Sequence, residues 1–357
     1  MGACRNVGID LGKETYEMKI IGTDGKVSGT NGRTNNAGRE SLYKKLLPSD
    51  RVAIEVCALG MVMAKEIKEK VGCEVALLNP SQVALIYRSV KKNDKEDALK
   101  LARLVQRYPT EELPAVELPT EHEENLRQTL TELRQLKKDR TRAINRLHAT
   151  FVECGITDIK KKDLGSGENR EESIKVLKGI ALAQARRALK MIALIEEQIE
   201  EVEKVLDEEI AGDENVERLM SVPGVGKQLA SAYTAYLGDG SRYHSASSIG
   251  AAVGLVPRLD MSSKVCRLGH ITKHGNSGLR SLLILAAWSH VRSRNGGALK
   301  DKFIHMTDVQ SKGRKVAIVA VARKLAEMMY SMLRNGTSYE KRTSVPVSNL
   351  AEEALAS

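Results

Sequence analysis

The sequence of 357 residues has few aromatic side chains, few cysteines and no long apolar run. Aromatic residues make up only 3% of the chain, which disfavours a protein that stacks single-stranded bases on exposed rings. The five cysteines are odd in number and none forms a Cys-x-x-Cys pair, so we expect reduced, mostly buried thiols rather than disulfides or a zinc site. No stretch approaches the ~18 apolar residues of a membrane span, and none resembles a signal peptide. We therefore expect a cytoplasmic protein with no membrane partner.

The residues that are present indicate folded domains and a polyanionic partner. Hydrophobic residues make up 42% and charged residues 29%, which excludes a mostly disordered chain. The 56 Lys and Arg exceed the 46 Asp and Glu, giving a net charge of +10. This surplus is typical of nucleic-acid-binding proteins, although a merely soluble basic protein would have it too.

The N-terminal third has the pattern of an α/β domain. We expect strands at residues 5–11, 17–23, 26–30, 51–56 and 74–78, and helices at residues 36–47, 61–71 and 93–107. Asp24-Gly25 predicts a hairpin turn, and the three prolines within residues 109–119 predict a linker.

Two long helices are predicted next, at residues 121–153 and 171–211. In the second, apolar residues recur at alternating intervals of three and four, the pattern of a coiled-coil seam: Ile192, Ile195, Ile199, Val202 and Leu206. Residues 171–214 contain 12 acids and 6 bases, so this segment is not expected to lie on DNA. It is expected to pack on another helix, either in a dimer or within one chain.

A mainly helical domain is predicted from about residue 215 to 334, followed by a polar tail. The run 222–226 (Val-Pro-Gly-Val-Gly) resembles a helix-hairpin-helix, in which Gly224 and Gly226 would present backbone N–H groups to a phosphate; a plain turn would have the same pattern. Residues 258–294 contain seven bases and one acid. The predicted nucleic-acid contacts there are Arg258, Lys264, Arg267, Lys273 and Arg280.

Four carboxylates are candidates for a metal site: Asp10, Glu55, Asp94 and Asp97. Asp10 and Glu55 each end an apolar strand, and we expect the glycines that flank Asp10 to leave room for a ligand. Asp94 and Asp97 share a helix face, although a helix cap and a solvated acid would explain these two alone. Converging carboxylates favour Mg²⁺ or Mn²⁺, which would act on a phosphodiester. This order of acids is typical of RNase H-like nucleases.

Ser262 and Ser263 lie among the bases of residues 258–294. A serine hydroxyl becomes a useful nucleophile only when its surroundings activate it, and nearby Lys and Arg would stabilise the charge that develops on a phosphate. A passive phosphate-binding loop would contain the same residues.

Taken together, these motifs resemble those of the insertion sequence 110 family of DEDD transposases, over nearly the whole chain. The N-terminal match consists of Gly8-Ile9-Asp10, Ile54-Glu55 and residues 93–98, which fit a Thr-Asp-x-x-Asp-Ala pattern. The C-terminal match consists of residues 222–226, 237–239, 254–258 and 267–276, in the family's order and spacing.

The resemblance implies an RNase H-like (RuvC-like) domain at residues 1–110, a linker and coiled-coil segment at 111–214, and a transposase domain at 215–334, with a polar tail at 335–357. It implies an RNA-guided DNA recombinase in which a structured non-coding bridge RNA pairs with donor and target double-stranded DNA. The four acids would bind Mg²⁺ (or Mn²⁺). It also implies homodimers and homotetramers with a site built from two chains, in a prokaryotic cytoplasm and at the nucleoid during transposition.

The resemblance also implies a nucleophile, since a family serine is taken to form a covalent 5′-phosphoserine with DNA. Counting without gaps from Pro257 and from Arg267 places Ser262 on that serine, and Ser263 is the alternative. The glycines usual in this run of the family are absent here.

Two other functions fit the composition: a metal-dependent Holliday-junction nuclease that uses water, and a non-enzymatic nucleic-acid-binding protein. The four placed acids argue against the second of these.

Overall fold

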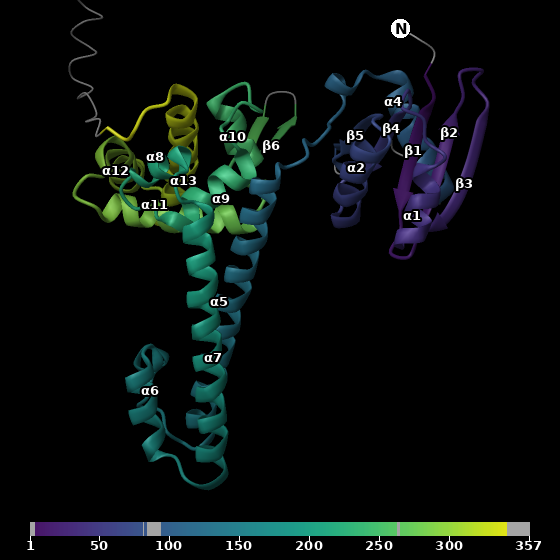
Figure 1. Cartoon of the computed structure of the whole chain (residues 1–357). Helices are drawn as coiled ribbons and strands as arrows, with labels where there is room; N and C mark the ends of the chain where they lie inside the picture. The colour runs from purple at the N-terminus through teal and green to yellow at the C-terminus, as the bar shows by residue number, and fades with distance from the viewer. Residues whose placement is uncertain (1–3, 81, 84–93, 263–264, 341–357) are drawn as a thin grey trace, which may run out of the picture. The chain divides into compact units, whose positions relative to one another are not determined.

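A computed structural model of the chain describes residues 4–80, 82–83, 94–262 and 265–340. The chain divides into two compact units, Met1–Pro119 and Thr120–Ser357, and each is described by itself (Figure 1). None of the helices in these described ranges is both long and apolar enough to span a membrane.

The N-terminal unit is built on a five-stranded mixed sheet with the order β3-β2-β1-β4-β5. Its strands are β1 (Asn6–Leu11), β2 (Thr15–Ile21), β3 (Val27–Arg33), β4 (Arg51–Glu55) and β5 (Glu74–Leu78). β1, β2 and β3 pair antiparallel, whereas β4 lies parallel to β1 and β5 parallel to β4. The predicted turn between β2 and β3 is confirmed, with Gly25 at a φ of 77°.

Helices cover both faces of this sheet. α1 (Asn36–Tyr43) and α2 (Ala58–Lys70) pack on the face to which Val7 and Ile9 of β1 point. α4 (Asp94–Arg107) packs on the opposite face, where its leucines meet Ala53 and Leu78. Because side chains alternate along a strand, Gly8 and Asp10 of β1 point toward α4.

The proline-rich segment that the sequence predicts as a linker runs along the open edge of β5. The amide of Val116 donates to the carbonyl of Leu77 at 2.6 Å, and the amide of Asn79 donates to the carbonyl of Pro114 at 3.1 Å. The segment therefore covers an edge that would otherwise present unpaired backbone groups.

The C-terminal unit combines a long helical hairpin with a cluster of helices. The hairpin consists of α5 (Glu121–Glu153) and α7 (Gly179–Glu209), with α6 (Gly167–Ser173) near its far end (Figure 1). The cluster contains α8 (Glu214–Met220), α9 (Lys227–Leu237), α10 (Ala246–Ala252), α11 (Ser277–Arg292), α12 (Gly297–Ile304) and α13 (Arg314–Asn335). Strands β6 (Pro257–Ser262) and β7 (Val265–Ile271) form a two-stranded hairpin.

The start of α5 is set by local hydrogen bonds. Thr120 and Glu123 form a capping box, which explains why this helix begins where the sequence predicts. The prediction of one helix over residues 171–211 is wrong. The chain breaks at Lys178, whose backbone is extended, and Gly179 has a positive φ of 57°, so α6 and α7 are separate.

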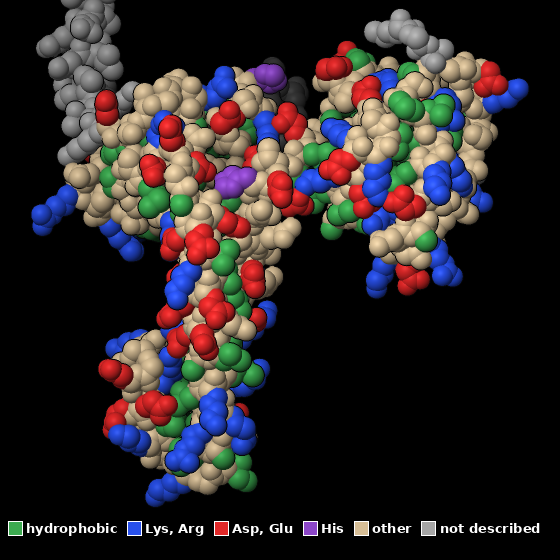
Figure 2. Space-filling model, viewed as in Figure 1, with side chains coloured by type: hydrophobic (Ala, Val, Ile, Leu, Met, Phe, Trp, Pro, Cys, Tyr) green, Lys and Arg blue, Asp and Glu red, His purple; other side chains and the backbone are tan. Residues whose placement is uncertain are grey.

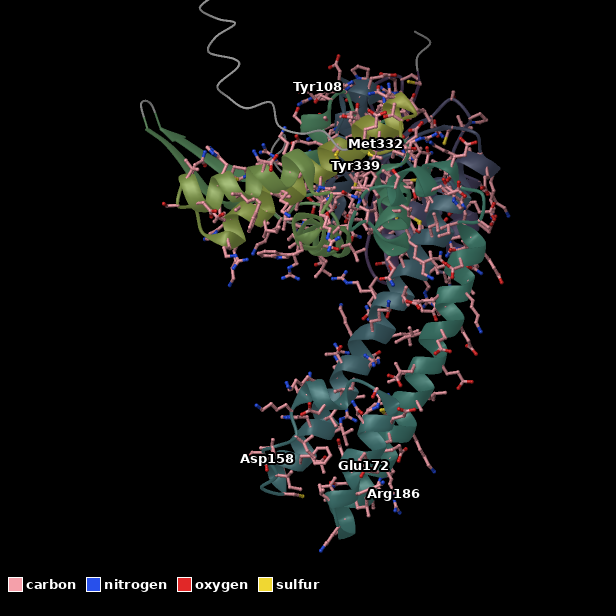
Figure 3. The ribbon with its side chains drawn as sticks, turned by 90° about the vertical axis from the view of Figure 1, so that its left-hand side faces the viewer. Tyr108, Asp158, Glu172, Arg186, Met332 and Tyr339 are labelled. Atoms are coloured by element: carbon pink, nitrogen blue, oxygen red, sulfur yellow. The ribbon has the colours of Figure 1, made fainter. Side chains whose placement is uncertain are left out.

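The apolar seam of α7 packs against α5 of the same chain. Ile199 and Leu206 are buried in one cluster with Leu126 and Leu133, and Ile192 is buried in a second cluster with Leu147. Of the two alternatives, the intramolecular hairpin is thus the one that the structure contains. Acidic side chains lie along the hairpin and basic ones gather at its far end (Figure 2), where Asp158, Glu172 and Arg186 are found (Figure 3).

We expect aspartates at both Ile195 and Ile199 to destabilise the C-terminal unit by about 4 kcal/mol or more, because two charges would enter an apolar cluster. The matched control places aspartates at Met191 and Leu194 of the same helix, which are 49% and 55% exposed. Thermal unfolding followed by circular dichroism measures both. Equal unfolding temperatures for the two variants would show that the seam is not buried within the chain.

Four of the five cysteines, Cys4, Cys57, Cys73 and Cys154, are unpaired, and the side chain of Cys266 lies outside the described part of the structure. Cys73 is buried, and burial raises the pKa of its thiol to about 11. Cys57 and Cys154 are exposed, so the expectation of mostly buried thiols is wrong for these two. Cys57 lies at the start of α2, where its sulfur accepts a hydrogen bond from the amide of Gly60 at 3.2 Å.

Candidate active site

Asp10 and Glu55 lie side by side at the carboxyl ends of two parallel strands. β1 and β4 are in register up to the pair Ile9 and Ile54, so the next residue of each strand is one of the two acids. Both side chains point to the face that α4 covers. The sheet register therefore creates the first half of the acidic cluster.

Gly8 allows α4 to approach this part of the sheet. A Cβ atom at Gly8 would lie 2.0 Å from the carbonyl oxygen of Ala98 and 2.4 Å from the amide nitrogen of Ala102. Any larger residue would push the helix away. The expectation that this glycine leaves room for a ligand is wrong, because the backbone of α4 fills that room. The close approach brings the first turn of α4 toward Asp10.

That first turn carries Asp94 and Asp97, which complete the cluster. Burial, and after it the negative charges of Asp94, Glu55 and Asp97, together raise the pKa of Asp10 to about 6. The pKa of Glu55 is also raised, first by burial and then by Asp97. The structure therefore brings all four predicted acids within electrostatic range of one another.

The sequence analysis missed one member of this cluster, Lys100. Its ammonium forms an ion pair with Asp97 three residues earlier on α4, and its positive charge partly offsets the raised pKa of Glu55. The signal that could have revealed it was the spacing of three residues, which places two helical side chains next to each other.

The donor set of this cluster fits a hard divalent cation, because every predicted ligand is a carboxylate. The mutual repulsion that raises the pKa of Asp10 is also what a cation would relieve. Within the described residues, however, no group of three or more His, Cys, Asp and Glu side chains is already arranged to hold a metal. The acids would have to turn toward an ion to bind it.

The candidate nucleophile lies in the other unit, on the β6–β7 hairpin. Ser262 is the last residue of β6 and its backbone is paired with Val265. Ser262 therefore lies at the end of a strand, in a region that the sequence predicts to be mainly helical. Figure 3 shows this green hairpin extending outward from the helices. Ser263 and Lys264 lie outside the described residues, as do the side chains of Ser262 and Arg267.

The predicted basic contacts around this hairpin differ in their availability. Arg258 and Lys273 are exposed. Arg280 is half-buried, and its Nη1 donates to the carbonyls of Val253 at 3.1 Å and His274 at 2.8 Å. In this structure the guanidinium of Arg280 holds two backbone segments together beside the hairpin.

The two glycines of the predicted helix-hairpin-helix have different surroundings. Gly224 has a φ of 88°, and a Cβ atom there would lie 2.8 Å from the backbone nitrogen of His290 on α11. It is thus needed for close packing on α11. Gly226 precedes α9 with open space around it and no side-chain cap, which leaves the first amides of α9 accessible.

A buried histidine, which the sequence analysis did not single out, supports this turn. The ring nitrogens of His290 contact the carbonyls of Pro223 at 2.7 Å and of Gly296 at 2.9 Å. His290 therefore ties the turn before α9 to the segment after α11.

Comparison with known proteins finds family models that match parts of both units. A family model described as "Transposase", of the DEDD type named for IS110, matches residues 7–156. A second model, described as "Transposase IS116/IS110/IS902 family", matches residues 216–303. The chain belongs to the IS110 family of transposases. Its acidic cluster lies within the first matched region and Ser262 within the second, so the predicted family and the predicted DNA transposase activity are confirmed.

Relatives of this IS110-family transposase match over most of their length. The transposase for insertion sequence element IS1328 of Yersinia enterocolitica is 28% identical, covering 94% of this chain and 98% of the relative. The transposase for insertion sequence element IS1111A of Coxiella burnetii is 27% identical, with 93% and 90% covered. A pilin gene-inverting protein of Moraxella bovis is 25% identical, with 75% of each chain covered.

Proposed function

We propose that this IS110-family transposase cuts and rejoins DNA through a covalent seryl-phosphate, with Ser262 as the nucleophile and the four acids as a Mg²⁺ (or Mn²⁺) site. The observation that carries the proposal is the acidic cluster around Asp10, whose pKa is raised to about 6. Such a cluster is unfavourable by itself and becomes favourable when it binds a cation.

We also propose that the N-terminal unit is an RNase H-like (RuvC-like) domain. The support is the placement of its acids on β1, on β4 and at the start of the helix α4 that packs beside them. The sequence alone associates this order of acids with RNase H-like nucleases, and the sheet register now places two of them on neighbouring strands.

In the proposed reaction the hydroxyl oxygen of Ser262 attacks a backbone phosphorus. An O–P bond to serine forms while the bond to the 3′ oxygen breaks, and the proton that serine loses is balanced by the one that the 3′ oxygen gains. A 3′ hydroxyl of another strand then attacks the seryl phosphate and releases the serine. The bound cation would polarise the phosphate. Arg258, Lys264 and Arg267 would stabilise the charge on the phosphate oxygens.

The guide RNA, the homodimers and homotetramers, the shared site built from two chains, and the association with the nucleoid rest on the family resemblance alone. A reconstituted reaction tests the RNA directly. Strand exchange on double-stranded DNA should require the non-coding RNA encoded beside the gene, and recombination by RNA-free protein would exclude a guide.

The acidic cluster by itself also supports a second candidate, a metal-dependent Holliday-junction nuclease that activates water. The two functions leave different products. Incubation with end-labelled DNA, followed by a denaturing gel, should show protein attached to one strand if serine attacks, and free ends if water attacks. The first result supports the transposase mechanism and the second replaces it.

We expect the variant Arg267→Gln/Lys273→Gln to lower the salt dependence of DNA affinity. Each lost phosphate contact reduces the slope of log affinity against log salt by about one, so the double variant should lose roughly two. Titration with duplex DNA at several salt concentrations measures the slope. An unchanged slope would place these side chains away from phosphate.

A further inference from the structure

A basic groove runs along the exposed face of α11, and the bases that α5 contributes to it are outside the segments that the sequence predicts to bind DNA. Two adjoining cavities of about 640 and 380 Å³ share Gln228 of α9 and Leu282 and Leu285 of α11 as lining. The larger cavity is bounded on its other side by α5. We call the two cavities together the α11 groove.

Basic side chains of α5 give the α11 groove its positive charge. Arg134, Lys138 and Arg142 line the larger cavity at intervals of four residues, which places them on one face of the helix with a rise of about 6 Å from each to the next. All three are exposed. Asp and Glu are absent from the described lining of both cavities, and α11 itself contains neither. The α11 groove is therefore positively charged.

These three bases have few competing partners. Arg134 donates one hydrogen bond to the hydroxyl of Ser277 at 3.3 Å. Arg142 pairs with Asp139 at the surface, where such pairs contribute little. For Lys138, no ion pair is found within the described ranges of the chain. The three charges can therefore turn to an external anion at small cost.

The remaining lining favours the backbone of a duplex over unstacked bases. Single-stranded nucleic acids are held mainly by aromatic rings on which bases stack. Tyr236 is the one aromatic residue in the described lining, and the guanidinium of Arg127 already lies over its ring, 5.1 Å from the centroid. The rest of the lining consists of Lys137 and Lys227, which pair with acids of α7, and of hydroxyl, amide and aliphatic groups. Hydroxyl and amide groups commonly contact phosphates and sugars.

We propose that the α11 groove binds the sugar-phosphate backbone of duplex DNA, as a contact additional to the β6–β7 hairpin. This proposal rests on the DNA-binding part of the proposed function and is independent of the serine mechanism. The groove positions the substrate, since none of its bases belongs to the residues proposed to react.

The first test neutralises the row of bases. In the full-length protein, Arg134→Gln/Lys138→Gln/Arg142→Gln should bind a short DNA duplex on the order of 30-fold more weakly near 0.1 M salt, with the salt slope lower by about three. The matched control is Arg186→Gln/Lys190→Gln/Lys204→Gln, which removes the same charge from exposed positions of α7. Equal losses in the two variants would overturn the proposal, because they would reflect net charge alone.

The second test adds a negative charge to the floor of the α11 groove. Leu285 is 65% exposed, so Leu285→Glu should fold normally and weaken DNA binding by about 10-fold. Leu194→Glu on α7, at a 55% exposed position, is the control and should bind as the wild type does. Unchanged binding by Leu285→Glu would exclude the groove as a DNA site, and a loss seen only with duplex RNA would assign the groove to RNA.

Measuring the covalent adduct distinguishes a failure of the groove proposal from a failure of the serine mechanism. At saturating DNA the triple glutamine variant should still form the protein–DNA adduct, whereas Ser262→Ala should bind DNA without forming it. Loss of the adduct at saturation in the triple variant would show that these bases do more than bind substrate.

Discussion

Replacing Ser262 by alanine is expected to eliminate both the covalent protein–DNA adduct and recombination, because a methyl group cannot attack phosphorus. The loss should be complete within detection, since no other group of the proposed mechanism forms the ester. Binding of duplex DNA should remain near the wild-type level. The measurement is a denaturing gel with end-labelled DNA, on which the adduct migrates as protein attached to one strand.

Two companion experiments sharpen this result. Ser262→Cys could retain only trace activity, since a thiolate is nucleophilic but forms a different ester, and EDTA should prevent the adduct in the wild type by removing the proposed cation. Ser263→Ala is the matched control one residue away. Retention of the adduct by Ser262→Ala together with its loss in Ser263→Ala would move the nucleophile to Ser263. If neither serine matters but the acids do, the nuclease that uses water becomes the better description.

Asp10→Asn or Glu55→Gln is expected to abolish strand exchange while leaving DNA binding largely intact. Each substitution removes a carboxylate from the cluster that β1, β4 and α4 bring together, and thereby a ligand of the proposed cation. Glu14→Gln, at an exposed acid before β2, is the control and should recombine normally. Normal recombination by Asp10→Asn would remove Asp10 from the active site.

The same variant has a predictable effect on stability. The pKa of Asp10 rises from 3.8 to about 6 on folding, so the folded protein binds this proton more tightly than the unfolded chain does. Ionising Asp10 therefore costs stability, a cost that grows from about pH 4 and is complete above about pH 6. Asp10→Asn should raise the unfolding temperature above pH 6 in the absence of divalent cations, and should change it little near pH 4.

A bound cation should stabilise the wild type against unfolding, as the substitution Asp10→Asn does. Mg²⁺ would relieve the repulsion among the carboxylates, so it should raise the unfolding temperature of the wild type more than that of Asp10→Asn. Equal shifts in the two proteins would indicate that Mg²⁺ binds elsewhere.

The sequence by itself determined the features that depend on residues close together in the chain. Alternating apolar residues and the Asp24-Gly25 turn predicted the strands of the N-terminal sheet, and a capping box set the first residue of α5. The motifs around Asp10, Glu55 and residues 93–98, together with those between residues 222 and 276, identified the family, because they occur in a fixed order along the chain. The N-terminal motifs among these contained all four acids of the cluster.

Only the tertiary structure decided how these parts meet. The heptad pattern around Ile199 is the same for a dimer and for a hairpin, and the packing on α5 shows the hairpin. The role of Gly8 required the position of α4, which comes from a distant segment, and so did the effect of Lys100 on Glu55. No single sequence motif predicts the α11 groove, because its charge comes from α5 and its floor from α11, more than a hundred residues apart. Contacts between distant segments depend on how whole helices and sheets pack, which periodicity within one segment does not encode.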